Sequence, residues 1–282
     1  WAPEGLDTQG PAALDSLVVK ILPESSVRTG ALQSEQVSVI GDTDPASIPQ
    51  LGSNVQLTST ESPGVPYSLY LNVTRPVFSN VDVRRAFAQG FDLDAAVKAV
   101  FNDTYQRAWS ILGPTTPNSY DASLENTGEF DAAQANSLLD AAGWTARDSE
   151  GFRTKDGQRL SARWISYTPV TDDNASLAAL IQDGLAKIGF ELKHDQLEPG
   201  AYMESYLSGD FDLADWGFAS ADADILRNHL ATDGFQNASH LSDPWIDSTL
   251  AAAVATTDEA QRAELYKQIQ QWNAENVAIV PL

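Results

Sequence analysis

Apolar and polar residues follow two different periods along this chain, and the period changes at regular intervals. From residue 161 onward, short apolar runs alternate with stretches in which apolar residues recur every three or four positions. The pattern predicts strands at 161–167, 190–197 and 211–218, with helices at 175–188 and 201–207 between them. Strands and helices that alternate at this spacing indicate an α/β sheet whose strands are connected through helices.

The remaining segments are assigned from the same periods and from Pro, Gly and capping residues. Residues 1–15, rich in Pro, Gly and small side chains, predict an irregular entry. Short β-branched or alternating runs predict strands at 18–22, 37–40, 55–60, 67–73 and 277–282, and a hairpin around Asp156-Gly157. Helices are expected after Ser25 or Ser26, at 44–51, twice across 81–101 with Asp92 as the second cap, at 131–142 before Gly143, at 244–255 and at 258–275. Residues 109–123 predict a long loop.

The stretch from Phe211 to Leu226 is the first candidate for a functional site. Trp216 and Phe218 lie on one side of the predicted strand, alternate with Gly217, and are followed by a loop with two aspartates. Ligands collect beyond the carboxyl ends of strands in α/β sheets, where loops can be shaped without disturbing the core. Two interpretations remain open: a small-molecule site, or a core strand followed by a solvated acidic turn.

Charge and composition exclude several classes of partner. Thirty-nine acidic residues against seventeen basic ones give a formal net charge of −22, which repels phosphate backbones and anionic lipids. Nucleic acid and membrane surfaces are therefore not expected partners. The acidic excess fits either solubility or a preference for cationic ligands. The chain has no cysteine, which excludes disulfides, thiolate metal sites and cysteine nucleophiles.

Enzymatic and metal-binding motifs are weak in this sequence. It contains no G-x-S-x-G elbow, H-E-x-x-H helix or phosphate-binding Walker loop, and we expect no cofactor. Asp222, Asp224, His229 and His240 offer oxygen and nitrogen ligands to a metal, although polar loop residues are the simpler interpretation. A pure protein-interaction module is a third alternative.

The order of several motifs resembles extracellular solute-binding protein family 5, the peptide-, oligopeptide- and nickel-binding components of ABC importers. The phrase YLNVTRPVFSNVDVRRAFAQGFDLDAAVKAVF at 70–101 carries the most specific resemblance. Further matches follow in order along the chain: FDAAQANSLLDAAGW, the Asp-Gly hairpin, LIQDGLAKIGFELK, YMESYLSGDFDLADWGF and LSDPWIDSTLAAAVATTDEAQRAELYKQIQQW. The resemblance covers nearly the whole chain.

The resemblance implies a periplasmic-binding-protein-like α/β fold (type II, cluster C-like), with a mixed sheet flanked by helices and two lobes around a cleft. Residues 1–70 would be the C-terminal part of the first lobe, and residues 71–282 the second, ligand-closing lobe. The two-lobe architecture would be incomplete here. The family's N-terminal half, with its export signal and lipid-attachment cysteine, and its C-terminal return to the first lobe would lie outside this chain.

The implied function is binding rather than catalysis. The protein would be a monomeric lipoprotein, extracellular at the cell surface or in the periplasm. It would capture a peptide or similar small solute and deliver it to ABC permease subunits in the membrane. Binding of nickel or another metal complex by the same fold is the alternative, and a hydrolase is a remote one.

The resemblance also implies ligand-binding residues. Family members that bind peptides meet the terminal ammonium with an aspartate in the loop after the W-G strand, and this loop is shortened here, so that Ala221 or Asp222 aligns with it. We assign Asp222 to that role. The full expected ligand-binding set is Trp216, Gly217, Phe218, Ser220, Asp222, Asp224 and Asn237. Ala238 replaces an aromatic residue expected after Asn237, which implies an altered or wider pocket.

Overall fold

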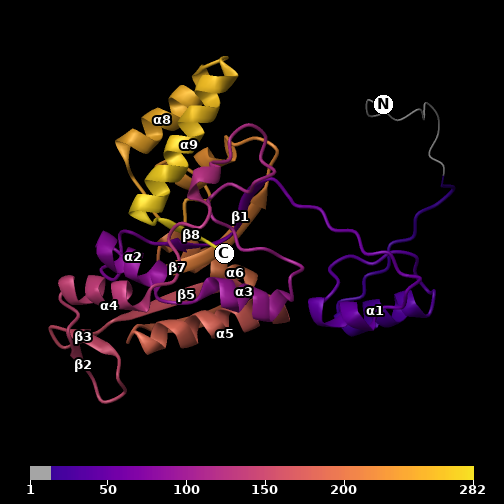
Figure 1. Ribbon diagram of the computed structural model, residues 1–282, viewed down its shortest axis with the longest axis horizontal. Coiled ribbons are helices and arrows are strands. Elements are labelled where there is room, and N and C mark those ends of the chain that lie inside the picture. The colour runs from indigo at the N-terminus through magenta and orange to yellow at the C-terminus, as the bar shows by residue number, and fades with distance from the viewer. Residues whose placement is uncertain (1–13) are drawn as a thin grey trace. The chain divides into compact units, whose positions relative to one another are not determined.

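The chain forms two compact units in the computed structural model, which describes residues 14–282 (Figure 1). One unit ends at Leu57 and the other runs from Thr58 to Leu282. Most of the irregular entry expected at 1–15 lies outside the described residues. The division falls earlier in the chain than the boundary near residue 70 that we expected.

The first unit contains two of the predicted helices but none of the predicted strands. Helix α1 (Ser25–Gln33) and a 3₁₀ helix (Pro45–Gln50) confirm that these two helices exist. The cap expected at Ser25 or Ser26 is wrong, because α1 begins at Ser25 and its N-cap residue, Glu24, makes no side-chain capping hydrogen bond. The strands predicted at 18–22, 37–40 and 55–60 are wrong, because these segments form no strand in the structure. Their apolar side chains are largely exposed, Ile21 at 88%. A strand needs a hydrogen-bonded neighbour, and the described part of this unit supplies none.

A five-stranded mixed sheet forms the centre of the second unit, as predicted from the family resemblance. Its strands lie in the order β6-β5-β7-β1-β8. Their bounds are β1 Gly64–Leu71, β5 Ser161–Tyr167, β6 Glu191–Leu197, β7 Leu213–Ala219 and β8 Ile279–Pro281. β5 pairs in parallel with β6 and β7, whereas β1 pairs antiparallel with β7 and β8. Residues 64–70, expected in the first lobe, thus belong to this sheet.

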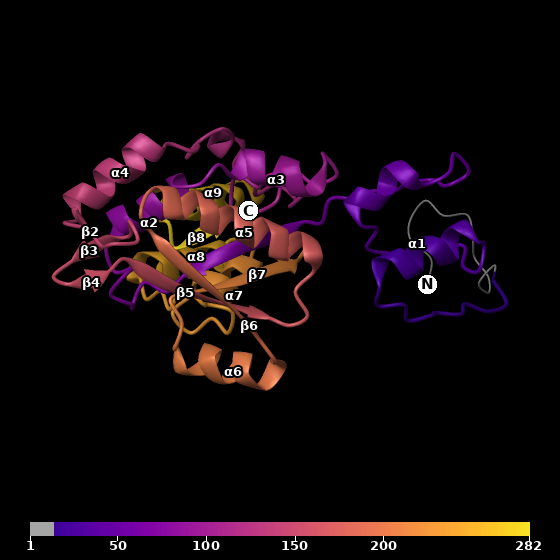
Figure 2. The ribbon, with the colours of Figure 1, turned by 90° about the horizontal axis from the view of Figure 1, so that it is seen from below.

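Helices cover both faces of the sheet, and α5 and α6 lie on opposite sides of it in Figure 2. The hydrophobic core on one face is built with α2 (Val81–Gln89), α3 (Leu93–Phe101), α4 (Ala132–Ala141) and α5 (Asp172–Lys187). The other core is built with α6 (Pro199–Ser208), α7 (Ile225–Leu230), α8 (Pro244–Ala255) and α9 (Glu259–Asn276). Successive side chains of β7 point to opposite faces of the sheet, so Leu213 packs in the first core and Ala214 in the second.

Local signals explain why most of these elements begin and end where the sequence predicts. Asp92 Oδ1 accepts a hydrogen bond from Ala95 N at 3.0 Å and caps α3 as expected. Asp156 and Gly157 both have positive φ, as a tight hairpin turn requires, and connect β3 (Arg153–Lys155) to β4 (Gln158–Arg159). A short strand β2 (Ala146–Arg147) completes this small sheet. The expected long loop contains one 3₁₀ turn, Ala122–Leu124. In the described residues, every helix is too short or too polar to span a membrane.

Candidate functional site

The carboxyl ends of β5, β6 and β7 meet at one edge of the sheet because these strands are parallel. β1 runs antiparallel to β7, so that its first residue, Gly64, lies opposite Ala219 at the end of β7. Gly217 allows the two strands to approach closely here: a Cβ atom at this position would lie 3.0 Å from Tyr67 N. The predicted site therefore lies at a true strand end.

Aromatic rings gather at this strand end on the face covered by α6. Trp216 is half-buried, and its ring centroid lies 6.3 Å from that of Tyr202 and 6.2 Å from that of Tyr206. Trp216 Nε1 and the Tyr202 hydroxyl are buried and have no hydrogen-bond partner among the described residues. Phe218, two residues further along β7, is 48% exposed. An apolar platform with two unpaired polar groups is typical of a small-molecule site.

Both predicted loop aspartates are already paired with arginines. Asp222 is exposed and lies 2.6 Å from Arg262. The hydrogen bond from the backbone of Asp224, together with Arg262, holds the pKa of Asp222 below its usual range despite partial burial. Asp224 binds Arg227 at 3.0 Å and accepts a hydrogen bond from the Tyr266 hydroxyl at 3.0 Å. A ligand cation at either aspartate would compete with an existing ion pair.

The two remaining predicted residues shape their own loops. Ser220 N donates to Pro63 O at 2.8 Å, which closes the end of the β1–β7 ladder, and its hydroxyl donates to Asp222 O. Asn237 is buried, and its side-chain amide bonds the backbone of Ala231 and Leu241. The structure thus brings Trp216 to Asp224 together along one strand and loop, and holds Asn237 inside the following loop.

Sequence reasoning missed a row of polar side chains on the opposite face of the same strand end. His194 on β6, Ser166 on β5, Asp215 on β7 and Tyr67 on β1 occupy four adjacent strands. Ser166 Oγ and His194 Nε2 lie 2.7 Å apart, and the Tyr67 hydroxyl donates to Asp215 Oδ2. We call these four residues the polar row. A carboxylate inside an otherwise apolar strand was the signal available in the sequence.

Burial controls the charge of the polar row. It raises the pKa of the Tyr67 hydroxyl far above its usual value, and the neighbouring Asp215 raises it further. Burial lowers the pKa of His194, although Asp215 acts in the opposite direction. Ser166 is buried. The distance between its hydroxyl and His194 is that of a nucleophile and its general base, but the two residues resemble such a pair in no other respect. Tyr67 and His194 are therefore uncharged at neutral pH.

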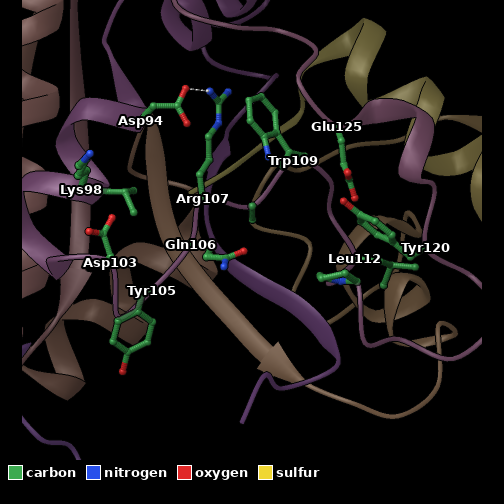
Figure 3. Close-up of a pocket in the computed structure, with 13 residues that line it drawn as sticks. Asp94, Lys98, Asp103, Tyr105, Gln106, Arg107, Trp109, Leu112, Tyr120 and Glu125 are labelled. Atoms are coloured by element: carbon green, nitrogen blue, oxygen red, sulfur yellow. Dashed lines mark hydrogen bonds and ion pairs between the residues drawn. The ribbon is translucent and has the colours of Figure 1, made fainter. Parts of the chain in front are cut away.

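A cavity of about 420 Å³ lies beside the start of β1 (Figure 3). Arg107 enters it with its guanidinium 3.9 Å above the Trp109 ring and 2.7 Å from Asp94. The loop that supplies Trp109 is tied to the sheet, because Gly113 N donates to Gly64 O at 2.8 Å. The sequence indicated only a long loop here. The cavity is open and mixes basic, acidic and aromatic residues, and three carboxylates accompany two cations in its lining.

The candidate metal ligands do not come together. His229 is fully buried and shares a hydrogen bond with the Tyr70 hydroxyl at 2.8 Å. Asp222 and Asp224, by contrast, belong to the arginine pairs of the loop. Across residues 14–282, no group of three or more His, Cys, Asp or Glu side chains has the arrangement needed to hold a metal ion.

Comparisons with known proteins agree with the fold. The family model described as bacterial extracellular solute-binding proteins, family 5 Middle, matches residues 1–237. Di/tripeptide-binding protein 1 of Pseudomonas aeruginosa is 30% identical over 278 residues, which are 95% of this chain and 49% of that protein. This chain therefore spans about half the length of the curated relatives that it matches.

Two solved structures extend the comparison. NikA from Brucella suis in complex with Fe(III)-EDTA superposes with a TM-score of 0.80 at 26% identity, over 94% of this chain and 55% of that one. DppA from Helicobacter pylori in complex with the peptide STSA gives a TM-score of 0.76 at 25% identity, over 93% of this chain and 49% of that one. One relative of known structure thus holds a metal chelate and another a peptide.

Proposed function

This chain belongs to the bacterial extracellular solute-binding proteins of family 5, and from that membership we propose that its protein captures a peptide or similar small solute for an ABC-type importer. The observation that carries the proposal is the 30% identity to a di/tripeptide-binding protein across 95% of this chain. The solute would be delivered to permease subunits in the membrane by a monomeric protein at the cell surface or in the periplasm.

The proposed site is the end of β7. Trp216, Gly217 and Phe218 would form the surface that meets the solute, and the loop of Ser220, Asp222 and Asp224 would bound it. Asn237 would act indirectly, by holding the neighbouring loop. Exposed main-chain groups at a strand end suit a peptide, whose own backbone can pair with them.

The unit from Thr58 to Leu282 would act as one wall of a cleft. We propose that it corresponds to the second lobe and the unit ending at Leu57 to part of the first. Family members of this design close two lobes on their ligand by a hinge motion, and the closed form engages the permease. Binding should then need surfaces from both lobes.

Two measurements test this function. Mass spectrometry of the complete natural protein, purified without denaturation, should reveal a bound peptide or other small solute, and that solute should raise the melting temperature when added back. A pure interaction module would carry no solute and show no such shift. The 282-residue chain alone should bind weakly or not at all, and submicromolar peptide binding by it would contradict the one-wall proposal.

A metal complex is the second candidate, because the NikA structure superposes well and holds Fe(III)-EDTA. With no metal-binding cluster among residues 14–282, the metal would have to arrive as a chelate. Equilibrium dialysis of the complete protein against Fe(III)-EDTA and against free Ni²⁺ separates the two forms. Uptake of neither would remove this candidate.

A further inference from the structure

The first residues of β1 are separated from the rest of the strand by an irregularity. Gly64 pairs with Ala219, but the register of the β1–β7 ladder shifts between Val65 and Ser68. Pro66, which lies in this gap, has no backbone N–H to donate to a neighbouring strand. Such irregularities interrupt the ladder and bend the strand locally. The start of β1 therefore needs contacts from outside the ladder to hold its position.

A turn in the long loop between α3 and α4 supplies these contacts at Gly64. The amide of Gly64 donates a hydrogen bond to Thr116 Oγ1 at 2.9 Å, and Gly113 N donates to the Gly64 carbonyl oxygen at 2.8 Å. Thr116 N donates to Gly113 O at 3.0 Å, which closes the turn. Thr116 is only 2% exposed, so bulk water does not replace its hydroxyl as the acceptor for Gly64. Both backbone groups of Gly64 are thus bound by one turn.

Gly64 in turn lies directly against the end of β7. Its φ is +107°, a backbone conformation that residues with a side chain rarely adopt. A Cβ atom at this position would lie 2.4 Å from Phe218 O and 2.5 Å from Ser220 N. Ser220 N donates a hydrogen bond to the carbonyl oxygen of the preceding residue, Pro63, at 2.8 Å. The two backbones are in direct contact here, so a displacement of Pro63 and Gly64 would also displace Phe218 and Ser220.

We propose that Thr116 is a positioning residue for the solute loop, by which we mean residues 220–224. It holds Gly64, and the neighbouring Pro63 holds Ser220. The assignment rests on the proposed function and deepens it, because it adds a residue that sets the shape of the solute site from outside that site. A buried N–H that loses its acceptor carries an unfavourable free energy, and the backbone at Gly64 would shift to relieve it. The hydroxyl of Thr116 therefore matters here, beyond the packing of its methyl group.

The first test measures amide exchange in the solute loop of the complete natural protein, without solute. Thr116→Val keeps the shape of the side chain but removes the acceptor for Gly64 N. The hydrogen bond from Ser220 N to Pro63 O should then open more often, and hydrogen–deuterium exchange of a peptide spanning 218–224 should quicken by about 10-fold. Thr116→Ser keeps the hydroxyl, and its exchange should stay within about 3-fold of the wild type.

The second test measures the affinity of the same proteins for tri-alanine by isothermal titration calorimetry. Thr116→Val should weaken binding by about 5- to 10-fold, because the solute loop then spends less time in the binding-competent position, and Thr116→Ser should bind as the wild type does. Thr249→Val is the matched control. It makes the same replacement at a buried position on α8, where the hydroxyl donates to Trp245 O at 2.7 Å, and should change neither exchange in the solute loop nor affinity.

The outcomes separate the role of Thr116 from the proposed function. Unchanged exchange in Thr116→Val overturns the assignment, and so does faster exchange with unchanged affinity, or an equal loss of affinity in Thr116→Ser. If the valine variant fails to fold, Gly113→Ala repeats the test: its Cβ atom would lie 3.3 Å from Ser62 O, and displacing the same turn should quicken the same exchange. Wild-type protein that binds neither tri-alanine nor a solute recovered from it by mass spectrometry contradicts the proposed function, whereas the exchange comparison still decides whether Thr116 holds the loop.

Discussion

Acidification should destabilise the second unit through one buried histidine. His229 is fully buried in the core on the α6 face, and its Nδ1 atom shares a hydrogen bond with the Tyr70 hydroxyl at 2.8 Å. Its Nε2 atom is buried and has no hydrogen-bond partner among the described residues. A charged imidazole would leave that N–H without an acceptor, and burial therefore lowers the pKa of His229 from 6.5 to about 4.

The sign and size of the effect follow from this shift. Between pH 6.5 and 4 the unfolded chain binds a proton at His229 that the folded chain does not, so stability falls as the pH falls through this window. At about 1.4 kcal/mol per pKa unit, the full contribution is about 3 kcal/mol. Between pH 7.5 and 4.5 it amounts to about 2.5 kcal/mol. Above pH 7.5 the neutral His229 makes its full contribution to the free energy of unfolding.

The assay compares wild type with His229→Asn by urea unfolding at several pH values. Six of the seven tryptophans lie after Thr58, so tryptophan fluorescence reports mainly the second unit. Asparagine offers Tyr70 an acceptor but does not titrate, so the variant should lose less free energy of unfolding on acidification. The gap between the two proteins should narrow by about 2.5 kcal/mol from pH 7.5 to 4.5. Parallel pH curves for the two proteins would refute the neutral, buried placement of His229.

Two further substitutions test the packing around the site. Gly217→Ala places a Cβ atom 3.0 Å from the backbone nitrogen of Tyr67, which cannot rotate away, and should cost about 1–3 kcal/mol in thermal melts. Gly200→Ala, a helical position with nothing within 4 Å, is its matched control and should be neutral or slightly stabilising; equal losses in the two variants would contradict the close strand contact. Arg153→Met removes a buried guanidinium whose Nε donates to Ile188 O at 2.9 Å, and should lower the free energy of unfolding by about 2–4 kcal/mol. Arg153→Lys should recover only part of this loss, because one ammonium cannot replace the planar five-donor fork, and full recovery would show that charge alone matters.

The helices and strands of the second unit could be predicted wherever local signals suffice. β5 spans the predicted residues 161–167, and α8 spans the predicted 244–255. An aspartate caps α8, and a proline occupies its first position; both signals act within a few residues. Helix α7 escaped prediction because six residues are too few to establish a helical period.

Strand pairing and the state of the site depended on contacts that no local pattern reveals. The β-branched runs of the first unit have the composition of strands, yet pairing requires a partner strand, and composition does not specify one. Asp222 looked available to a ligand until Arg262, forty residues away, was seen to bind it. Asn237 looked like a contact residue until its amide was found to hold its own loop.

The sequence by itself determined the family, the α/β alternation, and the position of an aromatic strand end followed by acids. These follow from periodicity, capping residues and motif order, which act over short stretches of chain. Only the tertiary structure decided which partner each acid has. Asp215 meets its partner Tyr67 across 148 residues, and the charge balance of a carboxylate depends on every group that folding brings near it. At the same strand end, the loop acid that the sequence favoured, Asp222, is therefore paired with Arg262.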